Sequence, residues 1–345
     1  MADIKYKSVP LNEAVGMMLG HDLTQIIPGE FKGPAFKKGH IIKEEDVTRL
    51  LDMGKMNIYV LDPKDGFIHE NEAAGRIANA SSGRGIRHSE PVEGRINFIS
   101  TGTGLLKVNK EALLKINLVE DITFATIHGN QIVKPDTAMA GTRIIPIATH
   151  EKNIGEVERI CRENYPVIEV KPFRHLRVGV ITTGSEVFSG RIKDKFGPVL
   201  KDKFKKMDCE VIKQVFVSDD VEKTVSAIHE LIKEGAELIA LTGGMSVDPD
   251  DQTPLSIRKS GARVITYGAP VYPGAMFMLA YIGNIPVVGL PGCVMYYRAS
   301  IFELILPLVI ADEPVTKEYI SSLGHGGYCS NCKECRYPVC GFGKQ

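Results

Sequence analysis

The sequence predicts an α/β protein that contains a three-layer α/β/α domain with a mostly parallel sheet. A β-rich N-terminal region precedes this domain and a short Cys-rich tail follows it. Two observations support the prediction. From residue 176 onward, β-branched apolar runs alternate with helical patterns, as in a parallel sheet covered on both faces. Before residue 173, short strand-like runs alternate with glycine and proline turns.

Length and composition limit the classes to which the protein can belong. The 345 residues suffice for about two or three domains. Acidic and basic residues balance at 42 each, so no overall field favours nucleic acid or a membrane surface as partner. The apolar runs are too short to span a bilayer, and the first residues lack a secretory signal. Together with an odd count of 7 cysteines, this predicts a cytoplasmic protein without a disulfide scaffold.

The N-terminal half divides into two accessory regions. Residues 1–94 contain strand-like runs, a helix at "KEEDVTRLLDMG", and a polar, glycine-rich stretch from residue 62 to about 93 that we interpret as a linker or mobile loop. Residues 95–172 form a second β-rich domain, with strands at "GRINFIST", "DITFATIHGNQIV" and "GTRIIPIAT" before a helix at "EKNIGEVERICRENY".

Residues 173–312 form the α/β/α domain. Strands are expected at "LRVGVITT", "CEVIKQVFVSDD", "AELIALTGG", "ARVITYGAPV" and "NIPVVGLPG". Helices are expected at "GPVLKDKFKKMD", "DVEKTVSAIHELIKEG", "TPLSIRKSG" and "YYRASIFELILPLVI". Residues 313–345 form the Cys-rich tail.

Three glycine turns fall at strand ends: "TTGSE", "LTGG" and "LPGC". In parallel α/β sheets, ligands bind beyond the carboxyl ends of the strands, where amide-rich turns cradle anions. Asp248, Asp250 and Asp251 crowd together after the second turn and offer oxygen ligands suited to Mg²⁺. The turns therefore predict a site for a phosphorylated cofactor or nucleotide. The alternative is that each glycine only permits a tight connection.

The tail predicts a metal centre. Cys329, Cys332, Cys335 and Cys340 follow a C-x2-C-x2-C-x4-C spacing, and closely spaced thiolates are common to zinc and iron–sulfur sites. The spacing leans toward a [4Fe–4S] cluster, but proline precedes the last cysteine, so zinc stays open.

Competing motifs are weak. The chain has no G-x-x-x-x-G-K-[ST] loop and no G-x-S-x-G elbow. "STGTGLLK" lacks the third glycine and the βαβ context of a dinucleotide site, so we interpret it as a turn.

The segments "TTGSEVFSGRIKDKFGPVL", "LTGGMSVDPDDQTP" and "VVGLPGCV" resemble the molybdopterin-binding domain of the molybdopterin molybdenumtransferase family (the MoeA and gephyrin type). The resemblance covers about residues 176–310 and implies a domain that binds molybdopterin and its phosphate. In the transferases it implies Mg²⁺-dependent insertion of molybdate into adenylylated molybdopterin.

Position by position, the resemblance implies catalytic roles for Glu186 and Asp251. Asp251 would hold Mg²⁺ against the ligand phosphate, with Glu186 facing it. Together, the resemblance and the glycine turns with their carboxylates give the expected ligand-binding residues: Thr183, Gly184, Ser185, Asp194, Gly243, Gly244, Ser246, Asp248, Asp250, Thr253, Pro291, Gly292 and Cys293.

The sequence departs from the family pattern at four places. Ser185 stands where aspartate is usual, and "PGAM" at residues 273–276 lacks the lysine of "PGKP". Cys293 and Phe196 each replace an asparagine. Pterin binding is expected to persist, whereas these departures weaken the case for full insertase chemistry.

Three functional classes stay open. The first is a molybdopterin molybdenumtransferase of molybdenum cofactor biosynthesis, which the N-terminal region favours. The second is a nucleotide amidohydrolase or pyrophosphatase that uses the same domain. The third is a non-catalytic carrier that docks on a molybdoenzyme acceptor. The expected partners are molybdopterin or its adenylylated form and molybdate, without nucleic acid or membrane, in a homo-oligomer.

Overall fold

The computed structural model describes residues 7–27, 31–61 and 66–344. The chain folds into two compact units. The first contains residues 1–100, 108–127 and 137–169, and the second contains residues 101–107, 128–136 and 170–345. The Cys-rich tail therefore belongs to the same compact unit as the α/β domain.

The first unit begins with short antiparallel strands around one helix. β1 (Lys7–Pro10) and β2 (Met18–Leu19) pair with the two sides of β5 (Asn57–Leu61), and β3 (Leu23–Ile27) forms a hairpin with β4 (Phe31–Phe36). A short 3-10 helix, η1 (Leu11–Glu13), follows β1. Helix α1 (Glu44–Asp52) begins with three acidic residues, which suit the positive end of the helix dipole, and buries Leu50. The predicted helix at this position is confirmed.

The rest of the first unit combines a four-stranded antiparallel sheet with three helices. The sheet has the order β10 (Ile122–Thr126), β12 (Ala138–Ile144), β8 (Ile96–Ser100), β7 (Ile86–His88). β6 (Phe67–His69) pairs with β13 (Ala148–His150). The helices are α2 (Glu70–Ser81), α3 (Lys110–Asn117) and α4 (Glu151–Glu163).

Helix α2 corrects the prediction of a linker over residues 62–93. Within the described part, residues 70–81 are helical, and the side chains at one face are fully buried: Ala73, Ala74, Ile77, Ala78 and Ser81. These positions recur at helical spacing, but four of the five side chains are small, so the apolar face is inconspicuous among polar residues. Alanine also has the highest helix propensity, which favours the helix once this face is covered.

The second unit is built on a six-stranded sheet. Its order is β16 (Glu210–Val217), β15 (Arg177–Thr183), β17 (Leu238–Thr242), β20 (Ile285–Leu290), β19 (Met278–Ile282), β18 (Arg263–Tyr267). The pairs from β16 to β20 are parallel, and β19 runs antiparallel to both of its neighbours. The predicted mostly parallel sheet is confirmed. β19 was not predicted from the sequence.

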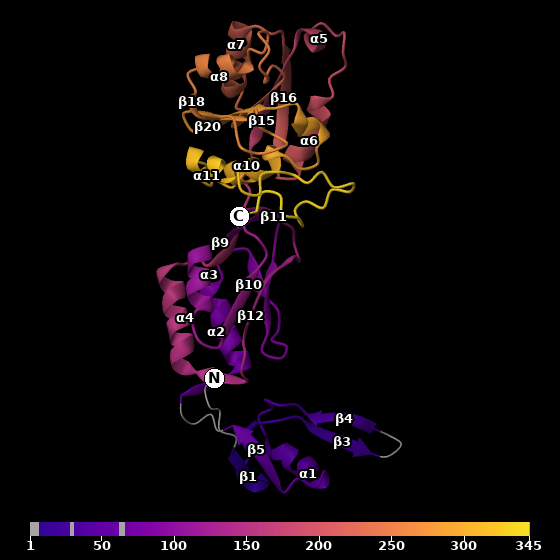
Figure 1. Ribbon diagram of the computed structural model, residues 1–345, viewed down its shortest axis with the longest axis vertical. Helices are drawn as coiled ribbons and strands as arrows, with labels where there is room; N and C mark the ends of the chain where they lie inside the picture. The colour runs from indigo at the N-terminus through magenta and orange to yellow at the C-terminus, as the bar shows by residue number, and fades with distance from the viewer. Residues whose placement is uncertain (1–6, 28–30, 62–65, 345) are drawn as a thin grey trace. The chain divides into compact units, whose positions relative to one another are not determined.

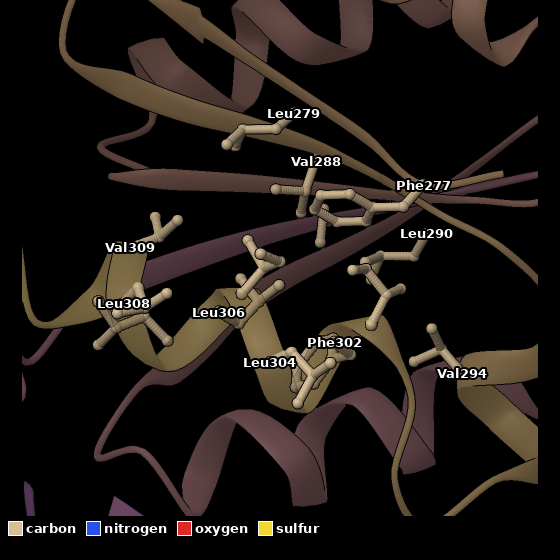
Figure 2. Packing of buried hydrophobic residues seen from close by; sticks show 14 of the residues in the cluster. Phe277, Leu279, Val288, Leu290, Val294, Phe302, Leu304, Leu306, Leu308 and Val309 are labelled. Atoms are coloured by element: carbon tan, nitrogen blue, oxygen red, sulfur yellow. The ribbon is translucent and has the colours of Figure 1, made fainter. Parts of the chain in front are cut away.

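Helices cover both faces of this sheet, which gives the predicted three layers. Figure 1 shows α7 (Val221–Lys233) and α8 (Thr253–Lys259) on one face, and α6 (Phe196–Lys205) and α10 (Ile301–Ile310) on the other. Successive residues of β17 alternate between the two cores: Ile239 packs with Ile228 of α7, whereas Leu238 packs in the cluster that contains Phe204 and Phe302. Figure 2 shows Leu279, Val288 and Leu290 from the sheet, and Phe277 just before β19, near α10 in this second core.

The helix predicted over "YYRASIFELILPLVI" begins later than expected. Residues 293–296 form a separate short helix, α9 (Cys293–Tyr296), and α10 begins only after Ser300. Ser300 caps α10: its hydroxyl accepts from Phe302 N at 3.2 Å, and its own N–H donates to Glu303 Oε2 at 2.9 Å. Tyr297 and Arg298 are consequently left outside any helix, with exposed side chains.

Shorter elements complete the second unit. β9 (Gly104–Val108) pairs with β11 (Gln131–Val133) and β14 (Ile168–Pro172) in a small sheet, so "STGTGLLK" contains a strand after its turn. α5 (Ser185–Phe188) follows β15, and α11 (Lys317–Ser322) precedes the tail. The tail residue Phe342 is 5% exposed and packs in the core beside α10. No helix in the described ranges is long and apolar enough to cross a membrane.

Candidate functional site

A cavity of about 400 Å³ lies where the turns after β17 and β20 meet the turn before β19. We call it the strand-end cavity. It occupies the position that parallel α/β sheets use for ligands, beyond the carboxyl ends of their strands. Its lining residues are Phe196, Gly243, Gly244, Met245, Ser246, Asp251, Ala275, Met276, Pro291, Gly292 and Cys293.

The Gly243–Gly244 turn requires glycine for two reasons. Both residues have positive φ, +88° at Gly243 and +53° at Gly244. A Cβ added at Gly243 would lie 2.1 Å from Thr183 O, and one at Gly244 would lie 2.9 Å from Thr253 Oγ1. The backbone of the turn is therefore packed directly against neighbouring atoms, and both glycines form part of the cavity wall.

Thr183 and Thr253 support this turn from its buried side. The Thr253 hydroxyl donates to Gly243 O at 2.8 Å and lies 3.1 Å from the Thr183 hydroxyl. Both side chains are buried, at 6% exposure for Thr183 and 1% for Thr253. They do not line the cavity, so the structure gives these two predicted binding residues a role in shaping the turn.

Of the three crowded carboxylates, only that of Asp251 reaches the cavity. Its Oδ2 accepts from Ser246 N at 2.8 Å, and its own N–H donates to Asp248 O at 2.9 Å. Asp248 and Asp250 are exposed and do not line the cavity. Asp251 Oδ2 thus stabilises the turn through its bond with Ser246 N, and Oδ1 takes no part in this bond.

The first glycine turn lies outside the cavity. Gly184 has a φ of +138°, and Ser185 donates from both its N–H and its hydroxyl to Asp219 Oδ2, each at 2.9 Å. Glu186 is exposed. None of these residues lines the strand-end cavity. Asp219 was missed by sequence reasoning, although its position at the end of the adjacent strand β16 was a usable signal.

Asp194 is engaged at the start of α6. Its two carboxylate oxygens accept from Phe196 N at 2.9 Å and Gly197 N at 3.0 Å, and Gln214 Nε2 donates to Oδ2 at 2.8 Å. A carboxylate in this position satisfies the first amide groups of a helix. Asp194 therefore fixes Phe196 at the edge of the cavity and does not line it.

The third turn contributes Pro291, Gly292 and Cys293 to the cavity wall. Cys293 is half-buried, and burial raises the pKa of its thiol. The thiol is consequently protonated near neutral pH and presents a weakly polar surface to the cavity.

Three of the four departures from the family pattern meet in this one cavity. Phe196, the segment Ala275 and Met276, and Cys293 all line it, so apolar groups stand where asparagine and lysine are usual. Asp251 is the only charged residue among the described residues that line the cavity. Met245, which sequence reasoning did not single out, adds a further apolar side chain that is 4% exposed.

The described residues contain no group of three or more His, Cys, Asp or Glu side chains arranged to hold a metal ion. In the tail, Cys329, Cys335 and Cys340 are partly buried against the core, and Cys332 is exposed. The described geometry therefore does not support the predicted zinc or iron–sulfur centre, which stays a prediction from spacing. The same holds for a multi-carboxylate Mg²⁺ site, because Asp251 supplies the one carboxylate in the described lining.

The comparisons with known proteins identify the domain that holds the strand-end cavity. Residues 179–311 match the family described as a probable molybdopterin binding domain, and residues 8–62 match a domain of unknown function. The resemblance found in the sequence is thereby confirmed over the α/β domain.

Individual relatives agree with this match. The chain is 30% identical over 150 residues to the molybdopterin molybdenumtransferase of Haemophilus influenzae, a match that spans 41% of this chain and 37% of that protein. It is 24% identical over 306 residues to the molybdopterin molybdenumtransferase of Staphylococcus epidermidis, covering 84% of this chain and 67% of the relative. The chain thus spans between 37% and 67% of the length of these two relatives.

Among solved structures, the molybdopterin biosynthesis enzyme MoaB of Thermus thermophilus aligns with 40% of this chain and 98% of its own. The aligned residues are 18% identical, and the TM-score is 0.32.

Proposed function

We propose that the chain binds molybdopterin at the strand-end cavity and acts in molybdenum cofactor biosynthesis. The observation that carries the proposal is the Gly243–Gly244 turn. Its backbone is held in a conformation that favours glycine, at the wall of a strand-end cavity, in a domain that matches a molybdopterin-binding family. The cavity volume, about 400 Å³, is within the range of small-molecule sites.

The main chain would provide most of the contacts to the phosphate of the ligand. Among the described residues that line the cavity, none is lysine or arginine. Backbone N–H groups of a glycine turn can bind an anion without a basic side chain. The apolar groups of Phe196, Met245 and Met276 offer surface for the ring system of the pterin.

Mg²⁺ fits this arrangement through one ligand. Magnesium in proteins commonly binds one or two carboxylates together with substrate phosphate oxygens. Asp251 can supply the carboxylate while its other oxygen keeps the bond to Ser246 N. When bound there, Mg²⁺ would offset the charge of the ligand phosphate beside this carboxylate. Glu186 lies outside the cavity lining, so we assign the acidic role to Asp251.

The finer proposal is Mg²⁺-dependent insertion of molybdate into adenylylated molybdopterin. The relatives named molybdopterin molybdenumtransferase support it. The molybdoenzyme acceptor and the homo-oligomer expected from the sequence are part of the same proposal.

A second candidate function is a non-catalytic molybdopterin carrier. One observation favours it: the cavity lining has apolar Ala275 and Met276 where the family turn has its lysine. Molybdate is an anion, and a cavity whose described lining is charged only by a carboxylate does not attract it. The carrier would bind the pterin and leave insertion to another protein.

An insertion assay separates the two candidates. The full chain is given adenylylated molybdopterin and molybdate, with and without Mg²⁺, and the metal-containing cofactor is quantified. An insertase gives Mg²⁺-dependent product, and Asp251→Asn, which keeps the hydrogen-bond acceptor but loses the charge, lowers it by about a hundredfold. The matched control is Asp250→Asn, at an exposed carboxylate outside the cavity. Pterin binding without product identifies the carrier, and absence of pterin binding contradicts both candidates.

A further inference from the structure

A second and larger cavity, of about 740 Å³, lies in the same compact unit. We call it the helical cavity, because α6, the segment after α9 and α10 form much of its wall. Its lining includes Lys203, Tyr296, Arg298, Phe302, Glu303 and the tail residue Tyr337. It shares no described lining residue with the strand-end cavity.

The acidic groups in the described lining of the helical cavity are already paired. Lys203 Nζ forms a salt bridge with Glu303, and both side chains are largely buried. Asp202 Oδ2 of α6 lies 2.6 Å from Nζ of Lys206, the residue that follows the end of this helix. These two carboxylates are thus neutralised by two lysines of the same lining.

Arg298 remains as an available cation. Within residues 7–27, 31–61 and 66–344, its guanidinium has no hydrogen bond, salt bridge or ring contact, and the residue is exposed. It lies in the irregular segment between α9 and α10, next to the Ser300 cap that fixes the start of α10. A planar, permanently charged guanidinium at the rim of a cavity suits a phosphate or carboxylate group of a ligand.

Aromatic side chains are the second feature of the helical cavity that suits a ligand. Tyr296 is 78% exposed although it lines a cavity, so a large ring face is accessible. On the inner side, Phe302 is 1% exposed, and Tyr337 donates its hydroxyl to Glu303 O at 3.2 Å. This bond links the tail residue Tyr337 to α10 in the wall of the cavity. Accessible rings of this kind bind planar heteroaromatic groups by stacking.

From this combination, we propose that the helical cavity is a second ligand site, for a planar heteroaromatic ring that carries one phosphate, a nucleoside monophosphate in size and charge. The ring would stack on Tyr296 and the phosphate would pair with Arg298. The volume is within the usual range of small-molecule sites. Inorganic phosphate lacks the ring, and a free nucleoside lacks the charge, so each should bind more weakly. The proposal does not depend on what occupies the strand-end cavity.

Calorimetric titration of the full chain tests this site, with AMP and GMP as the probes. Both should bind at one site per chain, more tightly than adenosine and inorganic phosphate do. Arg298→Gln should weaken binding by about tenfold or more, because it removes a charge-assisted hydrogen bond. Tyr296→Ala should weaken it by about fivefold or more, through lost stacking. Both side chains are exposed, so neither substitution is expected to disturb folding.

Two matched variants locate the effect. Arg95→Gln removes an exposed arginine of the other compact unit and should leave AMP binding unchanged. Asp251→Asn alters the strand-end cavity and should also leave it unchanged. The proposal is overturned if neither nucleotide binds, if Arg298→Gln and Tyr296→Ala both bind as the parent does, or if Asp251→Asn abolishes binding. The last result would assign the nucleotide to the strand-end cavity.

Discussion

The two cavities of the second compact unit differ in the source of their chemistry. The strand-end cavity has one charged residue in its described lining, Asp251, and a wall of glycine backbone. The helical cavity has basic side chains, a buried salt bridge between Lys203 and Glu303, and accessible tyrosines. The strand-end cavity can therefore be located from the sheet topology alone, although most of its side chains are apolar. The helical cavity is formed by side chains whose positions do not follow from the sheet topology.

The largest expected effect concerns the buried pair of the helical cavity. Lys203→Met should lower the free energy of unfolding by about 3–5 kcal/mol, because it leaves the Glu303 carboxylate buried without its partner. Thermal or chemical unfolding of the full chain measures this. Lys205→Met, at an exposed position of the same helix, is the matched control and should change stability little.

The same variant has a predictable pH dependence. Burial raises the pKa of Glu303, so the folded state binds its proton more tightly than the unfolded state does. The stability contributed by this proton is therefore fully present below the unfolded-state pKa and is lost as the pH rises through the folded-state pKa. The deficit of Lys203→Met should be smaller in acidic buffer than at neutral pH, and an equal deficit at both would contradict the role given to Glu303.

The strand-end cavity should instead be most sensitive at its backbone. Gly243→Ala places a Cβ 2.1 Å from Thr183 O at a positive φ, so we expect a loss of about 2–4 kcal/mol in stability and a loss of about a hundredfold in pterin affinity. Gly283→Ala is the matched control: its φ is also positive, but nothing lies within 4 Å of the added Cβ. It should cost about 1–2 kcal/mol and leave pterin binding intact.

If Gly243→Ala bound the pterin as well as Gly283→Ala does, the turn would not form the ligand-binding wall. The strand-end cavity would then not bind its ligand through the backbone, and it would not differ from the helical cavity in this respect.

A basic side chain in the strand-end cavity should give it a cation for phosphate binding, which the helical cavity already has. Ala275→Lys introduces a cation at the turn where the family carries lysine, and affinity for a phosphorylated pterin should rise by about tenfold at low salt. Calorimetry at two ionic strengths checks it, since added salt should reduce the gain. Ala275→Gln adds a side chain without charge and should show no such salt-dependent gain.

The smallest expected effect concerns the thiol in the strand-end cavity. Burial raises the pKa of Cys293, so iodoacetamide should modify it several-fold more slowly than the exposed Cys332 at mildly alkaline pH. Bound pterin should slow it further. Mass spectrometry of the alkylated peptides measures both rates, and equal rates for the two thiols would place Cys293 in open solvent.

Sequence reasoning was most successful where a regular pattern met a known topology. The order of strands and helices from residue 176 onward and the strand-end position of Gly243, Asp251 and Gly292 followed from periodicity and glycine turns. Helix α2 was missed because its buried face consists mostly of small residues. β19 was missed because the prediction placed no element between the strands expected at residues 262–271 and 284–292, where the structure adds an antiparallel strand.

The helical cavity was beyond sequence reasoning for a different reason. It joins Lys203 of α6, Arg298 of an irregular segment and Tyr337 of the tail, and only tertiary packing brings these positions together. In the same way, the hydrogen bond between Ser185 and Asp219 joins the ends of neighbouring strands, and no local sequence motif predicts it.

The tail shows the reverse situation: the sequence predicts a site there and the structure does not show one. The cysteine spacing predicts a metal centre, but the described residues contain no group arranged to hold a metal ion. Metal analysis of anaerobically purified protein, with Cys332→Ser and Cys335→Ser as controls, tests that prediction. About four irons or one zinc per chain in the parent, lost in both variants, would support it, and a metal-free parent would contradict it.

The central claim is that the Gly243–Gly244 turn forms a molybdopterin site, and native mass spectrometry of the full chain tests it most directly. The protein is reconstituted anaerobically with molybdopterin, exchanged into volatile buffer and weighed intact. We predict one pterin per chain in the parent and in Gly283→Ala, and none in Gly243→Ala. A parent chain that emerges without pterin, or a Gly243→Ala variant that retains it equally, would contradict the account.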